Sequence, residues 1–154
     1  MKIDFPLEVA LVDDEPGIVE LLCTSVESIK ELSAVGFTDS VKAYEEIKKR
    51  EIRVVLTDID MPNLRGDDLI LKCRKLPWSV DIIVMTAVRE RDLACRCFDA
   101  GAREILIKPS GYSDIIHAFN RILDRYKIWF QTMEDSAIDY SSRAVQKMDG
   151  DEEI

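Results

Sequence analysis

The sequence predicts an α/β fold in which helices cover a doubly wound, five-stranded parallel sheet. Strand-like apolar runs recur at near-regular intervals, and helix-length segments of mixed polarity separate them. The runs are continuous rather than alternating, which is typical of strands buried on both faces. Five strand–helix repeats therefore predict a parallel sheet with right-handed crossovers and five helices on its two sides.

Predicted strands and helices alternate along the first 130 residues. The strands are expected at 9–12, 33–37, 54–57, 81–86 and 104–108, and the helices at 16–32, 40–50, 66–76, 89–102 and 112–130. Pro16 suits a first helical turn, and Asp39 or Ser40 suits an N-cap. Gly101 follows an apolar helical stretch, where a left-handed C-terminal residue belongs.

Length, charge and composition limit the classes of protein. The 154 residues suit one domain with a tail, and the net charge of -9 argues against this chain itself gripping nucleic acid. The N-terminal apolar run is too short for a signal peptide, and no run is long enough to span a membrane, so we expect a cytoplasmic protein. The cysteines (Cys23, Cys73, Cys95 and Cys97) lack zinc-site spacing and are expected to be reduced and mostly buried.

Chemically capable side chains gather where the predicted strands end. Asp13 and Asp14 follow the first strand and Asp58 the third, while Thr86 and Lys108 end the fourth and fifth. The carboxyl ends of parallel strands form the ligand crevice, so we expect these side chains to converge. Neighbouring carboxylates repel unless a cation neutralises them, and Mg²⁺ prefers oxygen ligands. Asp58 is then a candidate nucleophile that forms an aspartyl phosphate.

Four segments at these strand ends carry a family resemblance. LVDDEP, LTDIDMPNLRG, VMTA and IKP resemble, in this order, the signature segments of response-regulator receiver domains of two-component signalling. The resemblance covers about residues 7–127 and implies the strand order 2-1-3-4-5, Mg²⁺ as cofactor, and a histidine kinase or phosphotransfer protein as phosphoryl source. Neither GxxxxGK nor GxGxxG occurs, so the donor is not expected to be a nucleotide bound by this chain.

The resemblance also implies roles for individual residues. Asp58 matches the phosphoacceptor, Asp14 the acid that contacts Mg²⁺ directly, and Asp13 the acid that acts through water. Asp60 matches the residue whose backbone carbonyl binds the metal.

The remaining matched positions include one departure from the family pattern. Thr86 matches the hydroxyl residue that turns toward the phosphoryl group, and Lys108 matches the lysine bonded to that group. Ile105, three residues before Lys108, stands where an aromatic switch residue is usual. In the family, the aromatic ring at this position swings inward together with the hydroxyl residue. Isoleucine has no such ring, so the resemblance does not imply the usual switch for this chain.

Three functions stay open at this level. We favour a receiver domain that catalyses only its own phosphorylation and dephosphorylation. The first alternative is a phosphohydrolase with Asp58 as nucleophile and Asp60 as its second acid, although the short loops leave no room for a substrate cap. The second is a binding module that works without phosphorylation, which Ile105 favours and the intact set of acids opposes.

The last predicted helix carries a heptad pattern that continues into a C-terminal extension at 128–154. Two series of apolar or aromatic residues recur seven apart, offset by three. They are Ile116, Leu123, Phe130 and Ala137, and Phe119, Tyr126, Met133 and Tyr140. The extension either folds back after a turn or two or projects as a homodimeric coiled coil or a linker to an output domain; we favour projection. Its acidic end is expected to be disordered.

Overall fold

The computed structural model describes residues 4–148, with side chains through residue 136, so the predicted disordered end lies outside the described residues. Residue contacts divide the chain into two compact units that meet between residues 119 and 120. Strands and helices alternate through the described part. They are β1 (Leu7–Val12), α1 (Pro16–Glu27), β2 (Leu32–Phe37), α2 (Ser40–Arg50), β3 (Val54–Thr57), α3 (Gly66–Cys73), β4 (Asp81–Thr86), α4 (Arg91–Ala100), β5 (Glu104–Ile107) and α5 (Tyr112–Met148).

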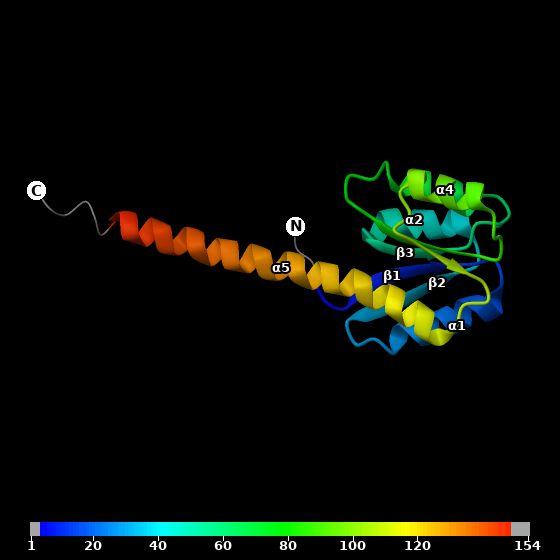
Figure 1. Cartoon of the computed structure of the whole chain (residues 1–154), viewed down its shortest axis with the longest axis horizontal. Coiled ribbons are helices and arrows are strands. Elements are labelled where there is room, and N and C mark those ends of the chain that lie inside the picture. Colours follow the sequence, from blue (N-terminus) through cyan, green and yellow to red (C-terminus); the bar gives the residue numbers. More distant parts are fainter. Residues whose placement is uncertain (1–3, 149–154) are drawn as a thin grey trace, which may run out of the picture. The chain divides into compact units, whose positions relative to one another are not determined.

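The five strands form one parallel sheet in the order β2-β1-β3-β4-β5, which confirms the predicted fold class and strand order. In the central register, Val9 of β1 pairs with both Ala34 of β2 and Val54 of β3. The chain thus adds β2 on one side of β1 and the later strands on the other (Figure 1). Such a reversal opens a crevice at the carboxyl ends of β1 and β3.

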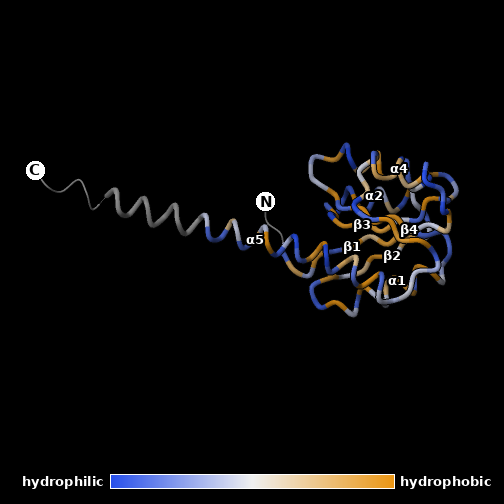
Figure 2. The backbone as a smooth tube through the Cα atoms, in the orientation of Figure 1, coloured by the Kyte–Doolittle hydropathy of each residue, from blue (hydrophilic) through white to orange (hydrophobic). Residues whose placement is uncertain are grey.

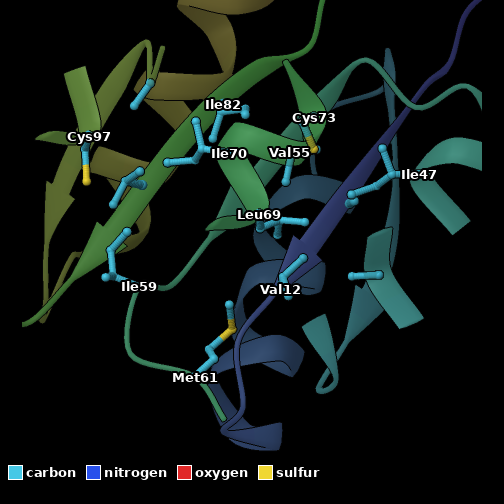
Figure 3. Close-up of a cluster of buried hydrophobic side chains, with 14 of the residues drawn as sticks. Val12, Ile47, Val55, Ile59, Met61, Leu69, Ile70, Cys73, Ile82 and Cys97 are labelled. Atoms are coloured by element: carbon cyan, nitrogen blue, oxygen red, sulfur yellow. The ribbon is translucent and has the colours of Figure 1, made fainter. Parts of the chain in front are cut away.

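One hydrophobic core lies between the sheet and the helices α2, α3 and α4. Val12, Val55 and Ile82 extend from the strands into a cluster that also contains Ile47 of α2 and Leu69 of α3 (Figure 3). Helix α1 covers the other face, where its Leu22 and Val26 are fully buried (Figure 1). Both faces of the central strands are therefore covered, as their continuous apolar sequences predict.

Burial on both faces holds only for the centre of the sheet. Nearly every residue of β1, β3 and β4 is buried, and hydrophobic residues concentrate there (Figure 2). The edge strands β2 and β5 are only partly buried, so the expectation of full burial is wrong for them. Each edge strand has a single neighbour, which leaves side chains such as Ile105 exposed to water, in this case by 37%.

Local signals set two of the predicted helix ends. The carboxylate of Asp39 accepts hydrogen bonds from the backbone N–H groups of Val41 and Lys42, and Gly101 ends α4 with a φ of 109°, so both predicted caps are confirmed. Helix α1 ends at Glu27, five residues before the predicted end. The backbone N–H of Ile29 bonds to the carbonyl of Val26 in a tight turn that precedes β2.

Helix α5 continues to Met148, well past the predicted end at residue 130. No Gly or Pro occurs between residues 112 and 148, so no residue in this stretch breaks the helix. The extension is therefore a direct continuation of the last helix rather than a turn that ends it. Across residues 4–148, every helix is too short or too polar to cross a membrane.

The four cysteines are free thiols, but only two of them are buried, fewer than expected. Cys73 and Cys97 are buried, Cys23 is half-buried and Cys95 is exposed. Burial raises the pKa of the Cys73 thiol to about 12, which keeps this side chain protonated and chemically inert at neutral pH.

Candidate functional site

Backbone hydrogen bonds of the sheet carry the predicted site residues to one edge. The N–H of Asp58 donates to the carbonyl of Val12 at 2.9 Å, which places the third strand's acid beside Asp13. The N–H of Lys108 donates to the carbonyl of Thr86 at 2.8 Å, which extends the pairing of β4 with β5. The sheet register thus fixes the backbone under each of these side chains.

Three carboxylates meet at this edge. Asp13, Asp14 and Asp58 each present an oxygen, and these oxygens lie within 4.8 Å of one another. Asp13 is fully buried and Asp58 is 8% exposed, whereas Asp14 is exposed. A set of hard oxygen donors that is open on one side suits a divalent cation that keeps some of its waters.

Lys108 is the cation that the fold itself supplies to this cluster. Its ammonium Nζ donates to Oδ2 of Asp13 at 2.6 Å and lies 3.3 Å from Oδ2 of Asp58. The lysine side chain is only 16% exposed. One lysine charge faces three carboxylates, so the cluster keeps an excess of negative charge that a further cation would neutralise.

Burial and neighbouring charges shift the pKa values of Asp58 and Lys108. Burial raises the pKa of the Asp58 carboxyl above its usual range, and the neighbouring Asp13 adds to this. Lys108 and the N–H of Ile59, which donates to Oδ1 of Asp58 at 2.8 Å, oppose the rise without cancelling it. Burial alone lowers the pKa of Lys108, but the hydrogen bond to Asp13 and the Asp58 charge raise it above its usual value.

The loop after β3 alternates between core and solvent. Ile59 is fully buried and Met61 is 6% exposed, and both point into the core (Figure 3). Asp60 between them faces outward, with its side chain 60% exposed. Its carboxylate pairs with Nη1 of Arg65 at 3.1 Å, while Nε of Arg65 pairs with Asp67 at 3.2 Å. The Asp60 carboxylate is therefore held by Arg65 and is not one of the three that converge.

Gly66 closes this loop against Asp58. A Cβ atom at Gly66 would lie 1.9 Å from the carbonyl oxygen of Asp58 and 2.8 Å from Cα of Ile59. The N–H of Gly66 also donates to the carbonyl of Ile59 at 2.9 Å. Only glycine allows such a close approach. Neither Gly66 nor Arg65 was among the predicted site residues; the one local signal was a glycine at the first position of a helix.

Thr86 and Ile105 occupy the positions that the sequence analysis assigned to switching. Thr86 is 1% exposed, and its hydroxyl oxygen accepts a hydrogen bond from the N–H of Val88 at 3.2 Å. Ile105 lies on the edge strand β5, where its side chain is partly exposed. The hydroxyl is thus held by its own loop, and no aromatic ring stands at position 105.

A family model described as the response regulator receiver domain matches residues 9–120, which is more than half of the chain. The chain belongs to this family. It is therefore a receiver domain of a two-component system, and a phosphoacceptor role in signal transduction follows from the family. Receiver domains bind Mg²⁺ at an acidic pocket, and this chain has a cluster of three aspartates at the corresponding end of its sheet.

Several curated relatives share this receiver domain. The transcriptional regulatory protein NatR of Bacillus subtilis is 30% identical over 77% of this chain and 51% of its own length. The two-component response regulator ORR1 of Oryza sativa is 31% identical over 70% of this chain and 51% of its own. The chain thus spans about half the length of these relatives. The chemotaxis protein CheY of Thermotoga maritima is 27% identical over 73% of this chain and is itself 94% covered.

Solved receiver structures superpose on this fold. A receiver domain protein from Clostridium thermocellum matches with a TM-score of 0.72 and 26% identity, over 80% of this chain and 98% of its own. A CheY-like receiver from Methanospirillum hungatei JF-1 matches with a TM-score of 0.73, over 79% of this chain and 96% of its own. At 21% identity, the second match shows the fold alone.

Proposed function

We propose that this receiver domain accepts a phosphoryl group on Asp58, in the presence of Mg²⁺, from a histidine kinase or a phosphotransfer protein. The observation that carries the proposal is the convergence of three carboxylate oxygens within 4.8 Å, beside a lysine that is 16% exposed. Phosphoryl transfer depends mainly on positioning and on charge stabilisation, and this cluster offers both.

The proposed step follows from these side chains. A carboxylate oxygen of Asp58 attacks the phosphorus, a new O–P bond forms, and the bond from phosphorus to the donor breaks. Lys108 lies 3.3 Å from the Asp58 carboxylate, close enough to pair with an oxygen of the arriving phosphoryl group. The buried hydroxyl of Thr86 is the proposed further donor to that group.

The proposed metal ligands are the carboxylates of Asp14 and Asp58, with Asp13 acting through water and Asp60 through its backbone carbonyl. Their hard oxygen atoms fit Mg²⁺. When bound, the ion neutralises the carboxylate charge that would otherwise repel a phosphoryl group. The exposed Asp14 is accessible to an ion with a partial water shell, whereas the fully buried Asp13 is already paired with Lys108.

We infer a signalling role rather than catalysis on a separate substrate. One relative, an Azospirillum brasilense protein-glutamate methylesterase/protein-glutamine glutaminase, is an enzyme, but this chain covers 31% of its length. We propose that the receiver occupies residues 7–127 and that the extension at 128–154 leads to an output domain or to a second copy of the chain. Phosphorylation of Asp58 would then switch that partner surface.

The test is phosphorylation of the full chain by a small-molecule phosphodonor with Mg²⁺, followed by intact-mass measurement. We expect a mass increase of one phosphoryl group that hydroxylamine removes, that a metal chelator prevents and that Asp58→Asn abolishes. Asp81→Asn is the matched control, because Asp81 and Asp58 are both 8% exposed and lie at opposite edges of the sheet. The control should be phosphorylated as the wild type is.

Other outcomes separate the alternatives. The absence of an adduct with every donor and metal, in a folded protein, would favour a binding module that works without phosphorylation. Rapid multiple turnover of an unrelated phosphate ester would favour a phosphohydrolase. An adduct that persists in Asp58→Asn would place the acceptor at another residue and refute the assignment.

A further inference from the structure

The second half of α5 exposes large apolar side chains. Ile128 is 66% exposed, Trp129 is 63% exposed and Met133 is 48% exposed. The helix nevertheless continues without a break to Met148. A helix in water gains most of its stability from packing of an apolar face. We therefore expect the apolar face of this long helix to pack against a partner.

The spacing of its apolar residues identifies the kind of partner. Six successive positions, separated alternately by four and three residues, are all apolar or aromatic, which is the core spacing of a coiled coil. These positions, which we call the seam, are Tyr126, Phe130, Met133, Ala137, Tyr140 and Ala144. In this register Ile128 occupies the position opposite the seam, so its exposure persists when a second helix packs there.

Polar side chains away from the seam bond to their own helix. Gln131 donates to the carboxylate of Asp135 at 3.1 Å. The hydroxyls of Thr132 and Ser136 donate to backbone carbonyls one turn earlier, at 2.9 Å and 2.7 Å. These groups are satisfied within the helix and require no partner. Within residues 131–136, these polar groups therefore do not account for a partner, and the exposed apolar side chains do.

The charge of the segment allows a second copy to approach. Residues 124–148 contain four acids and four bases, so this part of the chain is neutral although the whole chain is strongly acidic. The acids are Asp124, Glu134, Asp135 and Asp139, and the bases are Arg125, Lys127, Arg143 and Lys147. Within residues 126–144 alone, three acids stand against two bases, so two such helices side by side carry only a small excess of negative charge.

We propose that residues 126–144 form the seam of a two-stranded coiled coil with a second copy of this chain. A second copy supplies the same heptad register, the same length of unbroken helix and the same nearly balanced charge. The inference goes beyond the proposed phosphoryl chemistry, because the seam contains none of the residues at the acidic edge. Dimerisation is accordingly expected in Asp58→Asn as well, so the two proposals fail independently.

The test compares two substitutions of exposed apolar residues on the same helix, in the 154-residue chain. Met133→Glu places an acid inside the seam of each copy, whereas Ile128→Glu places the same acid on the outer face. Sedimentation over a range of concentrations should show a wild-type dimer. Met133→Glu should raise the dimer dissociation constant by about 100-fold or more, because two acids would face each other in an apolar contact. Ile128→Glu should change it by about threefold at most.

Circular dichroism and thermal unfolding verify that both variants keep the receiver fold, which is expected because both side chains are exposed. A wild-type chain that stays monomeric at every concentration would overturn the proposal. So would a dimer that Met133→Glu leaves intact, a dimer that Ile128→Glu disrupts equally, or an assembly larger than a dimer.

Discussion

The carboxyl ends and the amino ends of the strands, which we call the carboxyl edge and the amino edge of the sheet, both carry ion pairs. The pairs are similar in composition but differ in their surroundings. At the carboxyl edge, Lys108 pairs with Asp13 and Asp58, and its side chain is 16% exposed. At the amino edge, Nε of Arg103 pairs with Asp81 at 3.0 Å, but the arginine is 57% exposed. Water screens the second pair more than the first, so the two ends of the sheet differ in the burial of the cation rather than in the presence of an ion pair.

A second pair at the amino edge follows the same rule. Arg50 of α2 pairs with Glu8 of β1, and both side chains are more than a third exposed. Each of these two ion pairs joins one acid to one base. At the carboxyl edge, by contrast, three acids converge and one lysine pairs with two of them.

The largest expected effect is the loss of the buried lysine. Lys108→Ala should lower the initial rate of phosphorylation by a small-molecule donor by about 100-fold or more, because a positioned charge next to the transferred group is lost. Intact-mass measurement over time gives this rate. Arg103→Ala, which removes the cation of the other edge, should leave the rate within about twofold. Equal effects of the two substitutions would mean that the edges do not differ in the way proposed.

A medium effect is expected on the pH dependence of stability. The pKa of Asp58 is raised in the folded state, mainly by burial. Protonated Asp58 therefore favours folding at pH values below its unfolded-state pKa. This stabilisation is lost as the pH rises through the folded-state pKa. At neutral pH, without metal, the ionised Asp58 therefore destabilises the fold, and Asp58→Asn should increase the free energy of unfolding. This gain should disappear in acid.

Magnesium should make the wild type more stable than Asp58→Asn. An ion that binds only the folded protein raises its free energy of unfolding by about 1.4 kcal/mol when the ion concentration is ten times the dissociation constant. Asp58→Asn should lose most of this gain. Denaturant unfolding across pH, with and without Mg²⁺, measures both effects, with Asp81→Asn as the control. A metal-free Asp58→Asn protein no more stable than the wild type at neutral pH would contradict the assignment of burial as the dominant cause.

The smallest effects are expected at the amino edge. Arg103→Gln and Arg50→Gln should each change the free energy of unfolding by less than about 1 kcal/mol, because exposed ion pairs contribute little and salt screens them. Denaturant unfolding at low and high salt gives these values. A loss of several kcal/mol at either position would show that this edge, too, depends on a desolvated charge.

Features that depend on local sequence were predicted well. The central strands β3 and β4 have the predicted bounds, since their apolar runs are sharply limited by polar residues. The convergence of Asp13, Asp14 and Asp58 followed from the general rule that parallel strands share a carboxyl edge. The heptad pattern extended past residue 130, and the favoured continuation of the last helix beyond that residue is confirmed by α5, which ends at Met148.

Features that depend on distant contacts were not predicted. The exposure of β2 and β5 depends on which strands lie at the edges of the sheet, and apolar content alone does not reveal this. The pairing of Asp60 with Arg65 and the approach of Gly66 to the Asp58 carbonyl depend on how one loop closes. Such distances of a few ångströms are set by tertiary packing, which spacing along the chain does not specify.

The anchoring of the loop after β3 has a mechanical consequence. Ile59 and Met61 anchor this loop in the core on one side, and Gly66 closes it on the other, so little space remains around the backbone beneath Asp58. Close-packed interiors deform little and transmit strain. A group added to the Asp58 carboxylate therefore cannot be accommodated by sinking inward. Its volume and charge must displace the more exposed side of the site, which is where a partner protein would detect the change.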